Sequence, residues 1–139
     1  NALLCYYREQ AEKEHVKAAF QVSLFEKIPV TDTDLCIILG NLLENVVESC
    51  RRMVSSERFI ELELSMISGE LLMVSVKNSY EGVIHQAQDG AFFSAKAEGR
   101  RGIGISSILN ITEKYHGMSR VEYEDQVFQV SLLLRTAEE

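Results

Sequence analysis

The sequence predicts an α+β fold, a two-layer sandwich in which helices cover one face of a mixed, mostly antiparallel sheet. Two pairs of segments with period-two alternation, each joined by a short turn, predict two β-hairpins. Residues 31–53 carry an apolar stripe at the 3–4 spacing of a helix. The 139 residues, 46% of them hydrophobic, suffice for one buried core. Antiparallel hairpins with few helices are typical of this architecture.

The first two predicted elements are a helix over residues 2–15 and a strand over residues 16–25. The helix has partial helical spacing of its apolar residues and a polar half rich in Glu and Lys. The strand is predicted from apolar residues that mostly alternate along the chain: Val16, Phe20, Val22 and Leu24.

The long helix over residues 31–53 is the strongest prediction. Thr31 or Asp32 can cap its N-terminus, and the acidic residues of its first turn interact favourably with the helix dipole. Its predicted buried stripe consists of Leu35, Ile38, Leu39, Leu42, Val46, Cys50 and Met53.

The next predicted element is a β-hairpin over residues 58–79 with its turn near residues 68–70. Two sets of side chains should each lie on one face of their strand: Ile60, Leu62, Leu64 and Met66, then Leu72, Val74 and Val76. Residues 80–98 have no clear period, and their length exceeds that of an ordinary connection. We therefore expect a functional or mobile segment there.

The last predicted elements are a helix over about 103–116 and a closing hairpin that turns near Asp125 and Gln126. His116 and Gly117 should end the helix, with Gly117 in the left-handed C′ position that suits glycine.

Composition narrows the possible partners and the compartment. A net charge of -7 argues against general nucleic-acid binding and against electrostatic docking on anionic lipid. The cysteines, Cys5, Cys36 and Cys50, show no close metal-ligand spacing, and we expect reduced thiols, with Cys36 and Cys50 buried in their apolar run. No apolar run is long enough to span a membrane. Because the chain begins in mid-pattern at Asn1, we expect a fragment of a longer protein.

Two asparagines mark the long helix as a candidate binding element. Asn41 and Asn45 are four residues apart and share a face, and Glu48 follows on it. Asparagine is a poor helix former, so two on one face of an apolar helix suggest a buried polar task. Simple solvation of both side chains remains the alternative.

The stretch "GRRGIGI" over residues 99–105 places three glycines before a predicted helix. Gly102 and Gly104 would let free N–H groups at the helix start approach an anion, and Lys96, Arg100 and Arg101 add positive charge there. The order of elements disfavours the dinucleotide-binding fingerprint, and the phosphate-loop pattern is absent.

Asn78 ends a predicted strand in "VKNSYEG". Its amide offers both a donor and an acceptor to the edge of a purine. A plain turn at the strand end is the alternative interpretation.

Together and in this order, these stretches resemble the boxes of the GHKL ATPase superfamily, which comprises gyrase, Hsp90, histidine kinases and MutL. "LCIILGNLLENVVESC" resembles the N box, "VKNSYEG" the G1 box, and "FFSAKAEGRRGIGISSILNITEKYHG" the G2 box with the ATP lid before it. "VEYEDQVFQVSLLL" resembles the terminal hairpin. The similarity covers essentially the whole chain and is strongest to the ATP-binding catalytic domain of sensor histidine kinases in the quorum-sensing AgrC/VirS-like branch.

The resemblance implies the Bergerat α/β sandwich, with residues 1–15 as the end of a linker helix and residues 16–139 as the catalytic domain. Asn45 matches the Mg²⁺ ligand, and Asn41 lies where gyrase-like members carry a catalytic Glu, which favours a kinase over a fast hydrolase. Both are the implied catalytic residues. Asn78 matches the acidic residue that binds the adenine amino group. The implied ATP-binding set is Asn41, Asn45, Asn78, Gly82, Lys96, Gly102, Ile103 and Gly104.

The sequence departs from the family pattern at two places. Tyr80 replaces the first glycine of the G1 box, and Glu48 stands where many relatives carry Lys or Arg. These departures motivate one alternative function, a nucleotide-poor GHKL module that only binds partners. A protein serine kinase of the anti-sigma type is the other alternative.

The implied activity is transfer of the ATP γ-phosphate to a histidine on a dimerisation domain outside this fragment. His15, His85 and His116 do not lie in the helix pair that carries such an acceptor. The implied partners are ATP, Mg²⁺, that dimerisation domain and a response regulator, with no nucleic acid and no direct membrane contact. The fragment would be a cytoplasmic domain of a membrane-anchored parent.

Overall fold

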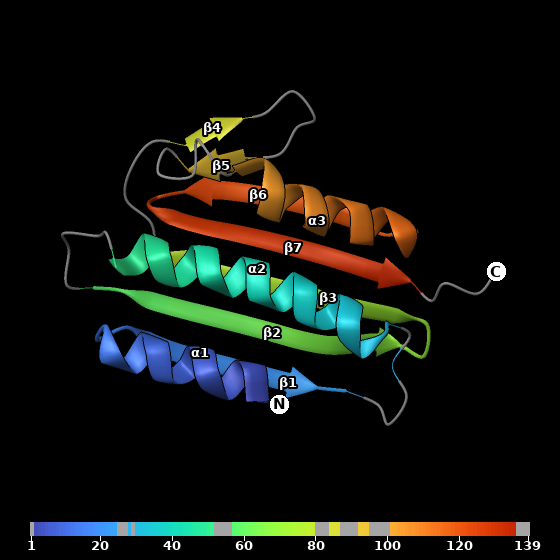
Figure 1. Ribbon diagram of the computed structural model, residues 1–139, viewed down its shortest axis with the longest axis horizontal. Coiled ribbons are helices and arrows are strands. Elements are labelled where there is room, and N and C mark those ends of the chain that lie inside the picture. The colour runs from blue at the N-terminus through green and yellow to red at the C-terminus, as the bar shows by residue number, and fades with distance from the viewer. Residues whose placement is uncertain are drawn as a thin grey trace.

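The computed structural model describes residues 2–24, 28, 30–51, 57–79, 84–86, 92–94 and 101–135. It confirms the predicted α+β sandwich, with a five-stranded sheet and three helices (Figure 1). The elements are α1 (Ala2–Lys13), β1 (Lys17–Ser23), α2 (Asp32–Arg51), β2 (Phe59–Ser68), β3 (Leu71–Ser79), β4 (Ile84–Gln86), β5 (Phe92–Ser94), α3 (Arg101–Lys114), β6 (Met118–Glu124) and β7 (Val127–Arg135).

The main sheet has the strand order β1-β2-β3-β7-β6. β1 and β2 are parallel, whereas β2–β3, β3–β7 and β7–β6 are antiparallel, as expected for a mixed, mostly antiparallel sheet. β4 and β5 form a separate antiparallel pair within residues 80–98, where the sequence predicts no element. Strands of three residues are too short to show an alternating pattern, which is why they escape prediction.

The core lies between the sheet and the helices, which lie on one face of it (Figure 1). Alternate residues of the central strands point into it, because successive side chains of a strand face opposite sides. The predicted buried faces of β2 and β3 are confirmed, and β7 adds two more buried residues to the same face of the sheet. The fully buried strand residues are Ile60, Leu62, Leu64, Leu72, Val74, Val76, Leu132 and Leu134.

α2 is buried on more of its surface than a single stripe would require. The predicted stripe is buried from Leu35 to Cys50, and Leu43 and Val47 are buried as well. α1 explains the difference, because it packs along α2 and buries Leu4, Tyr7 and Ala11 in the same core. Met53, the last predicted stripe residue, lies outside the described residues.

One polar contact links α1 to α2 at this interface. The Tyr7 hydroxyl donates a hydrogen bond of 2.9 Å to the Glu44 carboxylate. Burial, reinforced by the bond to Glu44, raises the pKa of Tyr7 to about 12. The phenol therefore stays protonated and keeps donating at every physiological pH.

α1 and α3 both end in a Schellman motif with histidine, not glycine, in the left-handed position. His15 has a φ of 60° and His116 a φ of 52°. At the end of α3, Gly117 N–H donates to Thr112 O at 2.9 Å and His116 N–H donates to Glu113 O at 3.0 Å. The prediction that Gly117 takes the left-handed C′ position is therefore wrong by one residue.

Gly117 serves a different purpose, which is close packing. A Cβ added at this position would lie 2.0 Å from the carbonyl oxygen of Leu133 and 3.1 Å from its carbonyl carbon. The chain leaves α3 and enters β6 directly against β7, so only a residue without a side chain fits.

The cysteines correct a second prediction. Cys50 is buried as expected, but Cys36 is exposed, and so is Cys5; all three are free thiols. Cys36 lies in the second turn of α2, away from the sheet, so apolar neighbours in the sequence did not imply burial. Among the described residues, no helix is long and apolar enough to cross a bilayer.

The first prediction concerns Gly117. Gly117→Ala should lower the free energy of unfolding by about 2–3 kcal/mol, because the new methyl group overlaps the Leu133 carbonyl. Gly40→Ala is the matched control: no atom lies within 4 Å of the added Cβ, so this change inside α2 should stabilise by up to about 1 kcal/mol. Urea unfolding of both variants checks this, and equal destabilisation by the two would contradict it.

The second prediction concerns the left-handed histidine. His116→Gly should raise the free energy of unfolding by about 1 kcal/mol, since glycine adopts a positive φ without the steric cost of a Cβ. Glu113→Gly, three residues earlier inside α3, should lower it by a similar amount. Thermal unfolding measures both, and a stability loss in His116→Gly would refute the assignment of the cap.

Candidate functional site

A partly buried polar cluster joins the start of α2 to the end of α3. The Asp34 carboxylate accepts a hydrogen bond of 2.6 Å from the Tyr115 hydroxyl and one of 2.8 Å from Lys114 Nζ. The Tyr115 hydroxyl in turn accepts a bond of 3.2 Å from the Thr31 N–H. These hydrogen bonds connect α2 and α3, which lie side by side and run in opposite directions (Figure 1).

The same cluster caps α2. Thr31 Oγ1 accepts a bond of 3.1 Å from the Asp34 N–H, so Thr31 is the N-cap, one of the two predicted candidates. Hydrogen bonds from Lys114 and Tyr115 hold the pKa of Asp34 below its usual value, and the bond to Asp34 raises the pKa of Lys114. Both groups therefore remain charged over the physiological pH range.

The two helix asparagines lie on the side of α2 that faces α3. They follow Asp34 by seven and eleven residues, intervals at which a helix side chain returns to nearly the same direction. Asn41 and Asn45 are both half-buried. Asn41 Nδ2 donates a hydrogen bond of 2.9 Å to the carbonyl oxygen of Ile37 in the same helix. The Oδ1 atom of Asn41 is the acceptor that the side chain can offer to another partner.

The first turn of α3 lies at about the same position along the helix pair as Asn45 of α2. Gly104 precedes Lys114 by ten residues along α3, and Asn45 follows Asp34 by eleven residues along α2. Since an α-helix rises by about 1.5 Å per residue, Gly104 and Asn45 both lie about 15 Å along their helices from the polar cluster. Gly102, Ile103 and Gly104 all lie in that first turn, where backbone N–H groups lack helical acceptors. Gly102 and Gly104 therefore belong to the helix start itself, because α3 begins at Arg101, two residues before the predicted start near residue 103.

Asn78 is at the end of β3 on the helix-covered face of the sheet, paired with Ile60 of β2. Only 1% of its surface is exposed. Its Nδ2 donates a hydrogen bond of 2.8 Å to the carbonyl of Ser79. Its Oδ1 is buried and has no hydrogen-bond partner among the described residues. A buried amide oxygen without a donor is costly, which is typical of a group that awaits a ligand.

The residues around Asn78 were not predicted from the sequence. Ser79 is 5% exposed and Cys50 is fully buried, with its Sγ 3.8 Å from Ser79 Oγ and 4.0 Å from the Ser79 carbonyl oxygen. Burial raises the pKa of the Cys50 thiol, so it stays neutral. Only the apolar setting of Cys50 signals this contact in the sequence.

Several predicted site residues cannot be placed. Gly82, Lys96, Tyr80 and Arg100 lie outside the described residues, and of Arg101 only the backbone in the first turn of α3 is described. Glu48 is half-buried and has an interaction partner. The structure therefore brings Asn41, Asn45 and the start of α3 to one side of α2 and places Asn78 beneath the helices.

Within the described part of the chain, no group of three His, Cys, Asp or Glu side chains could hold a metal ion. Mg²⁺ is commonly bound in proteins by one or two carboxylates together with substrate phosphates and water, so a larger group of acidic side chains is not a requirement for a magnesium site.

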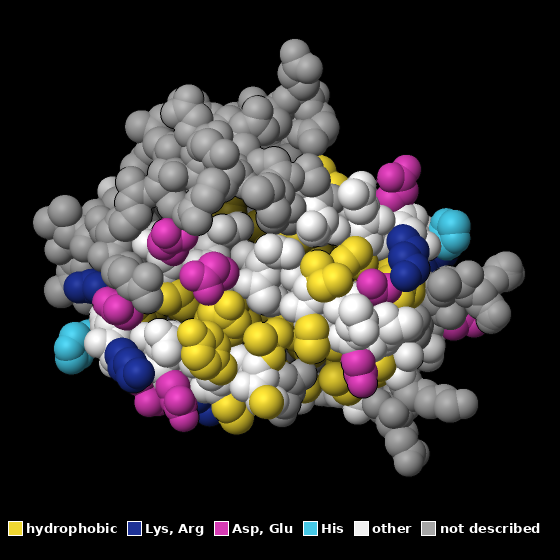
Figure 2. Space-filling view, in the orientation of Figure 1, with side chains coloured by type: hydrophobic (Ala, Val, Ile, Leu, Met, Phe, Trp, Pro, Cys, Tyr) yellow, Lys and Arg dark blue, Asp and Glu magenta, His cyan; other side chains and the backbone are white. Residues whose placement is uncertain are grey.

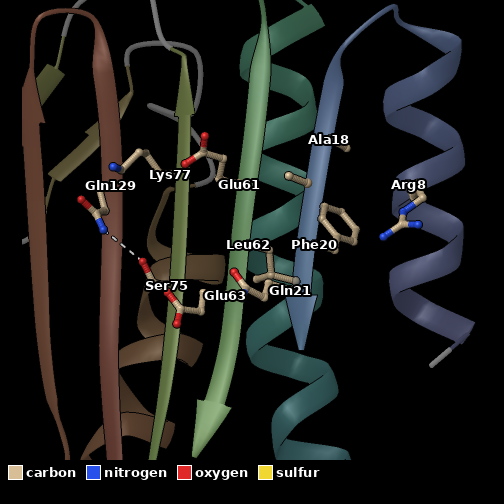
Figure 3. A pocket seen from close by; sticks show the side chains of 11 residues that line it. Arg8, Ala18, Phe20, Gln21, Glu61, Leu62, Glu63, Ser75, Lys77 and Gln129 are labelled. Atoms are coloured by element: carbon tan, nitrogen blue, oxygen red, sulfur yellow. Dashed lines mark hydrogen bonds between the residues drawn. The ribbon is translucent and has the colours of Figure 1, made fainter. Parts of the chain in front are cut away.

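The opposite face of the sheet carries a shallow cavity of about 450 Å³ (Figure 3). Polar side chains from β2, β3 and β7 project beside it, including Glu61, Glu63 and Lys77, while Arg8 of α1 lies over the Phe20 ring at its edge. None of the predicted site residues lines it. This cavity is therefore not the candidate site.

The helix-covered face shows apolar side chains over α1 and α2 (Figure 2). The large exposed apolar residues of these helices are Tyr6 and Ile37, which expose 52% and 38% of their surface. Ile37 lies one turn before Asn41 on the side of α2 toward α3, so apolar surface adjoins the polar site.

Comparison with known proteins identifies one family. A model of the GHKL domain matches residues 30–135 of the chain. A curated protein of Halalkalibacterium halodurans, described as a probable C4-dicarboxylate sensor kinase, is 29% identical over 98 residues, covering 68% of this chain and 18% of that protein. The chain thus spans about a fifth of the length of this relative.

Solved structures share the fold. The nucleotide-free catalytic domain of histidine kinase ThkA superposes with a TM-score of 0.70 at 17% identity, covering 99% of this chain and 91% of that chain. Full-length ShkA in complex with AMPPNP superposes with a TM-score of 0.69 at 22% identity, covering 99% of this chain and 30% of that chain. Mycobacterial sensor histidine kinase MprB superposes with a TM-score of 0.66 at 14% identity, covering 99% of this chain and 96% of that chain.

The third prediction concerns Asp34. Since its pKa is lower in the folded state, its stabilising effect is complete above the unfolded value of about 3.9 and is lost as the pH falls through and below that value. Asp34→Asn should therefore be less stable than wild type at pH 7 and lose less stability between pH 5 and pH 3. Asp32→Asn, an exposed change in the same helix turn, should keep the wild-type slope. Urea unfolding against pH measures the slopes, and a steep acid loss retained in Asp34→Asn would disprove the assignment.

Proposed function

The chain belongs to the GHKL domain family, and we propose that it is the ATP-binding catalytic domain of a sensor histidine kinase. It would transfer the γ-phosphate of ATP to a histidine on a separate dimerisation domain. One observation carries the nucleotide part of the proposal: the buried Oδ1 of Asn78 has no donor among the described residues, and the amino group of adenine is the donor that fits it.

The remaining parts of the nucleotide are assigned to α2 and α3. The N–H groups of Gly102 and Ile103 and the positive end of the α3 dipole suit phosphates. Asn45, level with that turn, would hold Mg²⁺ through its amide oxygen together with phosphate oxygens. When bound, the ion supplies charge neutralisation of the phosphates. Gly82 and Lys96, outside the described residues, belong to the same proposed set.

The reaction class follows from the side chains that α2 presents. Asn41 has no group that can take a proton, and its Nδ2 is already bonded to Ile37. An amide at position 41 cannot act as the general base that activates water, which favours a kinase, whose nucleotide is held for an external acceptor, over a fast hydrolase. Phosphoryl transfer asks mainly for positioning and charge stabilisation, which amides and helix-end N–H groups provide.

The context of the domain extends the proposal beyond the chain itself. We assign residues 1–15 to the end of a linker helix and the domain to the AgrC/VirS-like branch. The parent would be a membrane-anchored sensor with a cytoplasmic catalytic domain and a response-regulator partner. The sensor-kinase description of the Halalkalibacterium halodurans relative supports the sensor-kinase part of this proposal, and the folds of ThkA and ShkA agree with a kinase catalytic domain. The AMPPNP in the ShkA complex is a nucleotide analogue and agrees with an ATP site.

The fourth prediction tests nucleotide binding by thermal unfolding. Mg²⁺-ADP at one hundred times its Kd stabilises a protein by about 2.7 kcal/mol, which should raise the Tm of this domain by about 10 °C. Asn45→Ala should remove the Mg²⁺-dependent part of the shift. Asn110→Ala, an exposed asparagine on α3, is the matched control and should keep it.

The possible outcomes separate the alternatives. No shift at millimolar nucleotide would favour a partner-binding module that has kept only the fold. A shift in which Asn45→Ala behaves as wild type would reject Asn45 as the metal ligand while keeping the nucleotide. Phosphate transfer to a serine of a protein substrate, in place of histidine, would favour the anti-sigma type.

A further inference from the structure

Tyr115 is the residue at which α2, α3 and the sheet meet. Its hydroxyl donates to the Asp34 carboxylate at 2.6 Å and accepts from the Thr31 N–H at 3.2 Å, so its side chain is bonded to the start of α2. Its main-chain carbonyl accepts a hydrogen bond of 3.0 Å from the N–H of Arg135, the last residue of β7. Tyr115 directly follows α3, so the end of this helix is bonded both to the neighbouring helix and to the sheet.

The two bonds from the end of α3 to Asp34 differ in how far solvent reaches them. Tyr115 exposes 1% of its surface and Asp34 exposes 8%. The side chain of Lys114 is 57% exposed, so water and salt screen its ion pair with Asp34. A hydrogen bond shielded from water is stronger and holds its geometry more firmly. Tyr115, and not Lys114, therefore sets where the end of α3 lies against α2.

Fixing the end of α3 also fixes its start. An α-helix has a constant rise and rotation per residue, so the position of its last turn determines that of its first. In α3 the first turn contains the N–H groups proposed to bind phosphates, and it lies at about the same position along the helix pair as Asn45. A metal on Asn45 and the start of α3 can act on the same phosphates only while the two helices keep this alignment.

Resting on the proposed function, we propose that Tyr115 is a positioning residue that keeps the phosphate-binding start of α3 aligned with the metal-binding Asn45 of α2. It acts through Asp34, at a distance of about 15 Å along the helices from the phosphates. Remote contacts of this kind matter, because a displacement of about 1 Å in a positioning group can cost a site about 100-fold.

Tyr115→Phe isolates the hydroxyl from the rest of the side chain. The ring remains in the core, and the main-chain bond from Arg135 still holds the end of α3 to the sheet. Asp34 keeps only the solvent-exposed bond from Lys114 as its link to α3. The variant should therefore fold while α3 is free to shift along α2.

The test is calorimetric titration of the folded domain with ADP, once in saturating Mg²⁺ and once in excess EDTA. The ratio of the two affinities, here called the magnesium ratio, measures how well the metal and the start of α3 act on the same phosphates. Wild type should have a magnesium ratio of at least about 10. Tyr115→Phe should lower it at least about 3-fold. Its affinity in EDTA should change less than about 2-fold, because without the metal α3 can follow the phosphates.

Tyr7→Phe is the matched control. It also removes a phenol that donates to a carboxylate of α2, at 2.9 Å to Glu44, the immediate neighbour of Asn45. That bond joins α2 to α1 and not to α3. The magnesium ratio of Tyr7→Phe should therefore equal that of wild type, even where its Tm is lower.

Asp34→Ala is a second variant in case Tyr115→Phe does not fold. It removes the acceptor of the same hydrogen bond, and its magnesium ratio should also fall at least about 3-fold. Where both single variants fold, the double variant should show no further fall than Asp34→Ala alone, since the two changes remove one shared bond.

The failures are distinguishable. A wild-type domain that does not bind ADP would overturn the proposed function and this inference with it. Equal ADP affinity of wild type with and without Mg²⁺ would overturn the inference and the assignment of Asn45, but not nucleotide binding. An unchanged magnesium ratio in Tyr115→Phe or Asp34→Ala would overturn the inference alone. So would an equal fall in Tyr7→Phe, because the loss would then follow from weaker packing of α2 in general.

Discussion

The contact between Asp34 and the end of α3 is the constraint on which the geometry of the site depends. A sheet determines how far helices stand from it but not how far they slide past each other. The buried carboxylate removes that freedom, because it must keep its bonds to Tyr115 and Lys114 or lose them at a high cost. With the helices fastened there, their antiparallel course alone sets which residues of α2 lie opposite the glycines of α3.

Asn78 shows how the fold accommodates polarity at the edge of an apolar layer. Its neighbours on the same face, Val76 of β3 and Ile60 of β2, are buried hydrophobic residues. A valine at position 78 would extend the core and remove an unsatisfied acceptor. Keeping the amide sacrifices stability at the point where β3 ends, which is typical of functional sites.

The sequence predicts the parts of this protein that depend on periodicity. The long helix, both hairpins and the shared face of Asn41 and Asn45 follow from spacing alone. The pairing of Asp34 with Tyr115 does not, because the two residues are 81 positions apart and each fits its helix without the other. The burial of Cys50 but not of Cys36 depends on which side of α2 the sheet and α1 cover. The left-handed histidine is missed because glycine is the usual residue there and lies next to it.

The helix ends at His15 and His116 give the chain an unexpected internal likeness. In both cases a helix stops at a left-handed histidine, and an edge strand of the sheet begins two residues later. Each such helix–strand unit can form from contacts between sequence neighbours, with little loop-closure entropy. The parallel pairing of β1 with β2 instead joins distant parts of the chain. We therefore expect these helix–strand units to form early and the pairings between distant segments, β1 with β2 and β3 with β7, to follow later in folding.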